Sequence, residues 1–300
     1  VEWMYSDLIT AYNVALEADA AHPTCMTNAS VYYKSPKRTQ YVNNRPSTTT
    51  TFDSNTIYCL YYMGDYDSSA WLKKYTSTLW SDSNRSYIPC MWAFNPNLSD
   101  RVPMIFDYLY ENKLSTDYFV TGDSGAGYIM PTSLFAGNGV RTALPSGDVA
   151  WKNYCKPYMD LFQMDVTGFI INGNYTVNNN VMSLYKRISP VGSFHNDMNN
   201  KLSIYYGTPY IYLQNSVGDL STSVTTRAQT MYRFASNTMS GYNFASFRTI
   251  CYTPSDIQEL TEEFLSIAAA SNPSKKYKFV DVYTFFDLIK QSGQGTIIGG

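Results

Sequence analysis

Short apolar runs rich in β-branched and aromatic residues alternate with helix-like stretches along most of this chain of 300 residues. Such alternation favours parallel strands joined by right-handed helical crossovers. We predict strands near residues 26–33, 56–63, 88–94, 117–121, 166–171, 191–195, 209–214, 246–252 and 278–282. We predict helices at the start of the chain and at 69–80, 100–113, 154–163, 222–237 and 255–270, the last with Ser255 and Gln258 at capping-box spacing.

The number of predicted strands is near eight, and no dinucleotide-binding glycine fingerprint follows the first of them. Both observations favour a barrel over an open doubly wound sheet. The expected fold class is therefore α/β, a TIM-like (β/α) barrel with mainly parallel strands. Residues 1–291 are expected to form a single domain and residues 292–300 a flexible tail. Because the chain begins inside a helix-like segment, we expect it to be a fragment of a longer protein.

Charged residues make up only 15% of the chain, and the net charge is −2. This composition argues against a nucleic acid or an anionic membrane surface as partner, and we find no membrane-spanning segment in the sequence. Polarity comes instead from Ser, Thr, Asn and 28 tyrosines. That balance suits a neutral, hydroxyl-rich ligand and a secreted or cell-surface location.

The five cysteines are scattered along the chain without a CxxC spacing, so the sequence does not predict a zinc site. Cys59, Cys90 and Cys251 lie in strand-like runs, where a buried thiol acting as a small hydrophobe is the favoured interpretation. The sequence leaves the disulfide state open. We expect neither a cofactor nor a functional metal.

A glycine-rich turn follows the apolar run at 118–120. Gly122, Gly125 and Gly127 fall within six residues of one another, where the predicted strand ends. Glycine lets the backbone adopt conformations closed to other residues and lets a ligand approach the main chain closely. The sequence therefore indicates a functional site at this turn.

The segment "DYFVTGDSGAGYIMP" resembles the signature of the GxGYxYP family of putative glycoside hydrolases. Further blocks resemble that family in the same order, among them "NASVYYKSP", "MWAFNPNLSDRVPMIFDYLYENKLSTDYF" and "RTICYTPSDIQEL", so the resemblance covers most of residues 28–290. Two positions depart from it. Met130 replaces the second Tyr of the signature, and Tyr66 stands between Asp65 and Asp67 where we expect Gly. The resemblance implies a carbohydrate-active hydrolase.

Polar residues follow the predicted strands, and in a β/α barrel the carboxyl ends of the strands meet on the face that holds the active site. Amides donate to and accept from sugar hydroxyls, and aromatic rings stack on the apolar faces of sugars. We therefore expect a sugar cleft. Its predicted substrate-binding residues are Trp92, Asn97, Ser124, Tyr128, Asn172, His195 and Asp197. The alternative for each Asn is that it only satisfies the backbone of a turn.

Hydrolysis of a glycosidic bond requires two carboxyl groups, one acting as acid and one as nucleophile or base. Our catalytic candidates are Asp65, Asp67 and Asp123. Asp65 and Asp67 are two residues apart, so on an extended strand they face the same side. The alternative role of Asp123 is to cap its own turn.

Other functional classes remain open at this stage. The altered "MGDYDS" string allows a carbohydrate-binding or adhesion domain without catalysis. A metal-dependent hydrolase or deacetylase would use Asp65, Asp67 and His195 as ligands. A serine hydrolase is disfavoured, because "GDSG" lies in the wrong context and position 126 is Ala in place of the Gly of an esterase elbow.

Overall fold

The computed structural model describes residues 2–17, 29–46, 49–137, 143–214 and 216–299, without the side chains of residues 2, 3, 29 and 65. Its strands are β1 (Thr56–Tyr66), β2 (Cys90–Phe94), β3 (Asp117–Asp123), β4 (Val166–Ile170), β5 (Gly192–His195), β6 (Leu202–Tyr205), β7 (Thr208–Tyr212), β8 (Phe244–Ile250), β9 (Lys276–Phe279) and β10 (Thr296–Ile298). Its α-helices are α1 (Glu2–Thr10), α2 (Ala29–Tyr32), α3 (Ser69–Trp80), α4 (Pro103–Glu111), α5 (Asp148–Phe162), α6 (Asn179–Ile188), α7 (Val224–Arg233), α8 (Pro254–Ser271) and α9 (Val282–Ser292).

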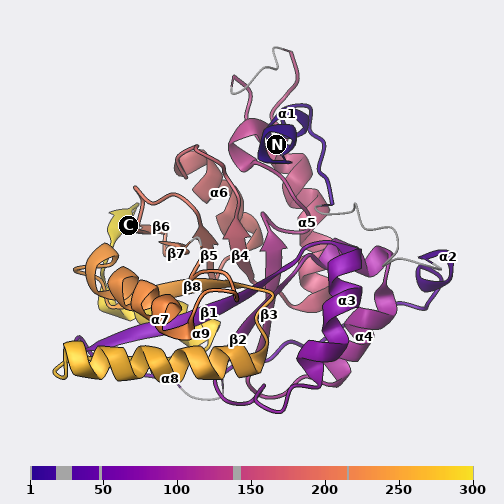
Figure 1. Cartoon of the computed structure of the whole chain (residues 1–300). Coiled ribbons are helices and arrows are strands. Elements are labelled where there is room, and N and C mark those ends of the chain that lie inside the picture. The colour runs from indigo at the N-terminus through magenta and orange to yellow at the C-terminus, as the bar shows by residue number, and fades with distance from the viewer. Residues whose placement is uncertain (1, 18–28, 47–48, 138–142, 215, 300) are drawn as a thin grey trace.

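The strands form one mostly parallel sheet in the order β10-β6-β7-β5-β4-β3-β2-β1-β8, with β9 paired to the first half of β1. Strand β6 runs antiparallel to β7. Helices surround the sheet, with α7 and α8 on one side and α3 and α4 on another (Figure 1). The predicted α/β class with mainly parallel strands is therefore confirmed.

The sheet is curled into a half-barrel. The ring of Tyr62 on β1 lies 6.0 Å from that of Phe169 on β4, although β2 and β3 separate these strands in the sheet. Gln214, just after β7, forms a parallel bridge with Phe247 on β8. This bridge joins the residue after β7 to the middle of β8 across the curled sheet, but a complete TIM barrel is not confirmed.

Aromatic side chains fill the layer between the sheet and the outer helices. Tyr61 on β1 stacks on Phe279 with ring centroids 4.9 Å apart, and Phe247 packs edge-on against Phe264 of α8. A second cluster of buried residues lies where α5 and α6 cover β4. Both faces of a parallel sheet covered in this way are apolar, which explains the near-continuous hydrophobic runs of the sequence.

Several predicted elements are wrong. Residues 29–32 form α2 where we expected a strand, and residues 26–28 lie outside the described chain. The capping box of α8 uses Thr253 and Asp256 in place of Ser255 and Gln258. The predicted tail begins inside α9 and contains β10, which pairs with β6.

Candidate active site at the carboxyl edge of the sheet

Asn95 ties together the two strand ends that carry Asp67 and Asp123. Its Oδ1 accepts a hydrogen bond from the backbone N–H of Asp123 at 2.9 Å, and its Nδ2 donates to the carbonyl of Asp67 at 3.4 Å. Asn95 directly follows β2, which lies between β1 and β3 in the sheet. One amide side chain thus brings the backbones of both aspartates to the same edge.

The backbone beside Asp123 is closely packed against the side chain of Asn95. A Cβ atom at Gly122 would lie 2.3 Å from Oδ1 of Asn95, so the hydrogen bond to Asp123 requires glycine there. Asp123 is 4% exposed, whereas Asp67 is half-buried. The side chain of Asp65 lies outside the description, but its backbone belongs to β1, where the pairing with β2 is irregular between Met63 and Tyr66. Such irregularities redirect side chains and are common next to active sites.

Ser124 serves the backbone of the signature turn, which corrects its predicted role in binding substrate. Its φ of 61° is a left-handed conformation that costs energy in a residue other than glycine. The hydroxyl donates to the carbonyl of Ile129 at 2.8 Å and accepts from the N–H of Ile171 at 3.0 Å. The Ser124 carbonyl accepts hydrogen bonds from Trp151 and Tyr185. This fully bonded turn fixes the position of the neighbouring Asp123.

Tyr128 is enclosed by the N-terminal segment of the chain. Its N–H and carbonyl pair with the carbonyl and N–H of Leu16 at 3.0 and 3.1 Å, forming an antiparallel bridge. The residue is 2% exposed. Its ring therefore has no open face for the sugar stacking that we expected. The N-terminal segment, which we had interpreted only as a helix, instead forms one wall of the signature loop.

Trp92 is also placed away from the predicted cleft. Its indole is buried against Trp80 of α3, with ring centroids 4.9 Å apart, and its Nε1 donates to Asp117 at the amino end of β3 at 2.8 Å. The side chain therefore packs on the outer face of the sheet, under the helices. The expectation that it stacks on substrate is wrong.

The loops after β4 and β5 are stabilised by hydrogen bonds to three buried side chains, those of Asn172, His195 and Asp197. The Oδ1 of Asn172 accepts from the N–H of Thr132 at 3.1 Å, and the carboxylate of Asp197 accepts from the N–H of Val177 at 3.1 Å. Asn172 and Asp197 are 0% and 7% exposed. Their side-chain atoms therefore order loop backbone, which is the alternative role that the sequence left open for Asn.

His195 is a fully buried imidazole at the end of β5. Burial lowers its pKa to about 4, an effect that the nearby charge of Asp197 only partly opposes. The Nδ1 atom accepts a hydrogen bond from the N–H of Asp197 at 3.2 Å. The ring is therefore neutral at neutral pH.

Asn97 lies beside the signature loop. Its side chain is half-buried, contacts Tyr154 of α5, and lies against Gly127. The structure therefore divides the predicted residues. Asp67 and Asp123 lie at one edge, Asn97 lies beside the signature loop, and the remaining polar residues support the turns.

Arg248 on β8 is a candidate site residue that the sequence reasoning missed. Its guanidinium carbon lies 4.9 Å from the ring centroid of Phe169 on β4, so the side chain crosses the concave face of the sheet. A guanidinium offers several donors in a planar fork, which suits carboxylates and sugar hydroxyls. The signal was present in the sequence as a charged residue within the otherwise uncharged strand FASFRTI.

Among residues with described side chains, no group of three or more His, Cys, Asp or Glu is arranged to hold a metal ion. No helix of the described chain is long and apolar enough to cross a membrane. Cys59, Cys90 and Cys155 are free thiols, and Cys25 lies outside the described residues.

Residues 55–290 match the family described as the GxGYxYP putative glycoside hydrolase C-terminal domain. The chain belongs to the GxGYxYP family. Its signature forms the turn after β3, with Gly125 at a φ of 126° and Gly127 packed against Trp151 and Asn97. In this GxGYxYP domain the signature therefore follows directly on the end of β3, next to Asp123.

Solved structures resemble the GxGYxYP domain, among them the following two. One, described as a putative hydrolase from Bacteroides thetaiotaomicron, has a TM-score of 0.75 and 18% identity over 97% of this chain and 55% of that chain. The other, described as a putative polysaccharide deacetylase from Mycobacterium smegmatis, has a TM-score of 0.51 and 7% identity over 83% of this chain and 96% of that chain. At these identities the likeness concerns the fold. A search of curated proteins found no match. Because the match covers 55% of the Bacteroides chain, this chain spans about half the length of that protein.

Proposed function

We propose that this domain binds an oligo- or polysaccharide at the carboxyl edge of its sheet and hydrolyses a glycosidic bond. Asp123 and Asp67 would supply the acid and the nucleophile or base, with Asp65 as the third carboxyl group of the same edge. Membership of the GxGYxYP family supports the reaction class. The observation that carries the assignment of residues is the Asn95 side chain, which holds the strand ends of both aspartates.

Unequal surroundings support separate roles for the two carboxyl groups. Asp123 is almost completely enclosed, whereas Asp67 is half-buried. Paired carboxyl groups in different environments are how glycosidases obtain one acid and one base from the same chemical group. Arg248, on the concave face, would bind sugar hydroxyls or balance the carboxylate charge.

We further propose a secreted or cell-surface setting, because uncharged polar residues and tyrosines dominate a chain with a net charge of only −2. The 55% coverage of the Bacteroides chain supports the proposal that further domains belong to the same polypeptide.

One observation favours the rival function of a carbohydrate-binding domain without catalysis. Tyr66, the last residue of β1, lies between Asp65 and Asp67, is 1% exposed and packs against Trp92 and Phe94 on the outer face of the sheet. Anchoring this residue in the core sets the direction of its neighbours. If the resulting arrangement separates the carboxyl groups too far, the domain binds sugar without cleaving it.

The test is to incubate the domain with a panel of neutral polysaccharides and to measure both binding and the release of new reducing ends. The variant Asp67→Asn keeps the size of the side chain but cannot act as acid or nucleophile, and we expect at least ~10²-fold slower release. Asp160→Asn is the matched control, because this carboxyl group is 60% exposed on α5. Binding without release by the parent would replace the hydrolase assignment with the binding-domain function, and neither binding nor release would refute both.

A further inference from the structure

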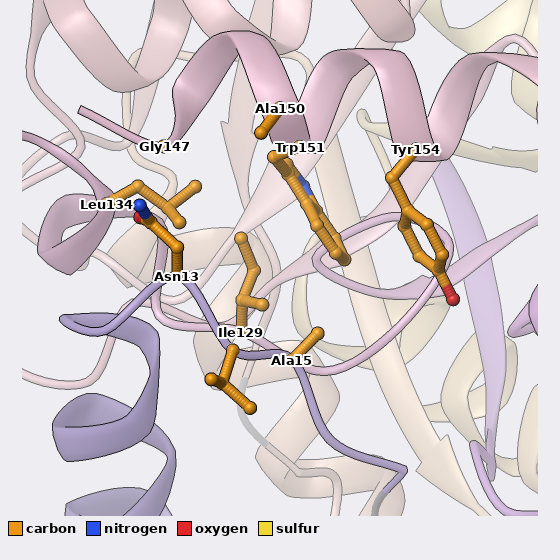
Figure 2. Close-up of a pocket in the computed structure, with 9 residues that line it drawn as sticks. Asn13, Ala15, Ile129, Leu134, Gly147, Ala150, Trp151 and Tyr154 are labelled. Carbon is orange, nitrogen blue, oxygen red and sulfur yellow. The ribbon is translucent and has the colours of Figure 1, made fainter. Parts of the chain in front are cut away.

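A cavity of about 340 Å³ lies between the first turns of α5, the signature loop and the N-terminal segment (Figure 2). Its walls thus come from the N-terminal segment and from two later parts of the chain. The lining residues are Asn13, Val14, Ala15, Ile129, Leu134, Gly147, Ala150, Trp151 and Tyr154. This volume lies at the small end of the range of about 300–1,000 Å³ for ligand pockets, which suits a single sugar ring.

Two aromatic side chains form one wall of the cavity. The rings of Trp151 and Tyr154 are stacked, with centroids 5.4 Å apart and planes at 27°. Figure 2 shows both side chains projecting from α5 toward the segments that carry Ala15 and Ile129. Tyr154 is 40% exposed. An accessible tyrosine ring backed by an indole offers a flat surface for the C–H face of a pyranose.

The lining residues of this cavity carry no charged side chain. The acid of the adjoining helix turn, Asp148, is paired with Arg187 at 2.8 Å. Asn13 contributes an amide at the wall, and its Nδ2 donates to the carbonyl of Pro145 at 3.4 Å. An uncharged cavity with an aromatic wall and an amide suits a neutral sugar better than a uronate, an amino sugar or a phosphate.

The cavity is connected through hydrogen bonds to the turn that presents Asp123. The Nε1 of Trp151 donates to the carbonyl of Ser124 at 3.3 Å, and the carbonyl of Ile129 accepts from the Ser124 hydroxyl at 2.8 Å. Two wall residues are therefore bonded to the residue that follows Asp123. A sugar chain lying along this turn would have one unit in the cavity and the next units toward the carboxyl edge.

We propose that this cavity is a subsite for one neutral pyranose unit of the polysaccharide, stacked on Tyr154. The subsite rests on the proposed function for its substrate class. It adds the residue that provides stacking and the selection of an uncharged ring.

The test measures the affinity of the folded domain for short neutral gluco-, manno-, galacto- and xylo-oligosaccharides by calorimetry, beside uronate and amino-sugar oligomers of equal length. Tyr154→Ala is expected to weaken binding of the preferred neutral oligomer ~10-fold, the loss of one aromatic contact, while Tyr154→Phe retains most of the affinity. Tyr108→Ala is the matched control, because Tyr108 is 44% exposed on the separate helix α4. Its affinity should equal that of the parent.

Three results would overturn the subsite: equal affinities for Tyr154→Ala and Tyr108→Ala, tighter binding of the charged oligomers, or no binding of any oligomer by the parent. Failure of the hydrolase assignment is distinguishable. If the parent binds and Tyr154→Ala does not, but no reducing ends appear, the subsite stands and catalysis is excluded. If Tyr154→Ala and Tyr108→Ala release reducing ends at equal rates and bind the oligomer with equal affinity, catalysis stands and the subsite is refuted.

Discussion

The stability of this domain should depend on pH through His195. The imidazole is fully buried, and burial lowers its pKa from the ordinary 6.5 to about 4. Between these values the unfolded chain binds a proton that the folded chain does not bind. The free energy of unfolding therefore rises with pH across this window. The contribution of His195 to stability is lost as the pH falls from about 6.5 toward about 4. At ~1.4 kcal/mol per pKa unit, the full effect is about 3 kcal/mol.

The assay is urea unfolding at about pH 7 and about pH 4.5, where the proton linkage of a single such histidine predicts a loss of about 2 kcal/mol. The variant His195→Asn removes the titration but retains an acceptor in place of Nδ1 for the N–H of Asp197. The difference between parent and variant cancels the other titrating groups. His22→Asn removes the other histidine of the chain as a control. Equal pH dependence in the parent and His195→Asn would refute the reasoning.

Three further outcomes follow from the packing. Gly122→Ala should destabilise the domain by about 1–3 kcal/mol, measured by urea unfolding, because the added methyl meets Oδ1 of Asn95; unchanged stability would show that the Asn95 bridge is not needed. Asp117→Ala should lower the free energy of unfolding by about 3–5 kcal/mol in the same assay, because it leaves the buried guanidinium of Arg85 without its carboxylate. A decrease below about 1 kcal/mol would contradict this. Burial raises the thiol pKa of Cys59, Cys90 and Cys155, so we expect mass spectrometry to find these cysteines alkylated only after unfolding. Rapid alkylation of the folded domain would contradict their placement.

The alternation of strands and helices was predictable because its causes are local. The predicted helix 69–80 coincides with α3, whose N-cap Ser68 accepts from the N–H of Trp71. The helix α6, which we did not predict, begins in an Asn-rich stretch, where Asn178 caps it through two backbone N–H groups. Strand β6 forms a hairpin with the neighbouring β7, whereas the short β10 depends on pairing with the distant β6. Local sequence does not encode such pairing.

The site was predictable in its position along the strands but not in the direction of its side chains. Strand ends located Asp67 and Asp123 at one edge, since parallel strands share their carboxyl ends. Trp92 was misplaced because both faces of a parallel sheet are apolar, so the sequence does not say which alternate residues face the helices. The bridging role of Asn95 depends on contacts with two other strands, which no local pattern reveals.

The most direct test of the central claim is the rate at which Asp123→Asn releases reducing ends from the polysaccharide that the parent cleaves, compared with the exposed control Asp160→Asn. The amide keeps the size of the side chain and leaves the backbone bond to Asn95 in place. We predict a rate at least ~10² lower than that of the parent, with the melting temperature unchanged. A rate equal to that of the parent, in a folded variant, would remove Asp123 from the catalytic site.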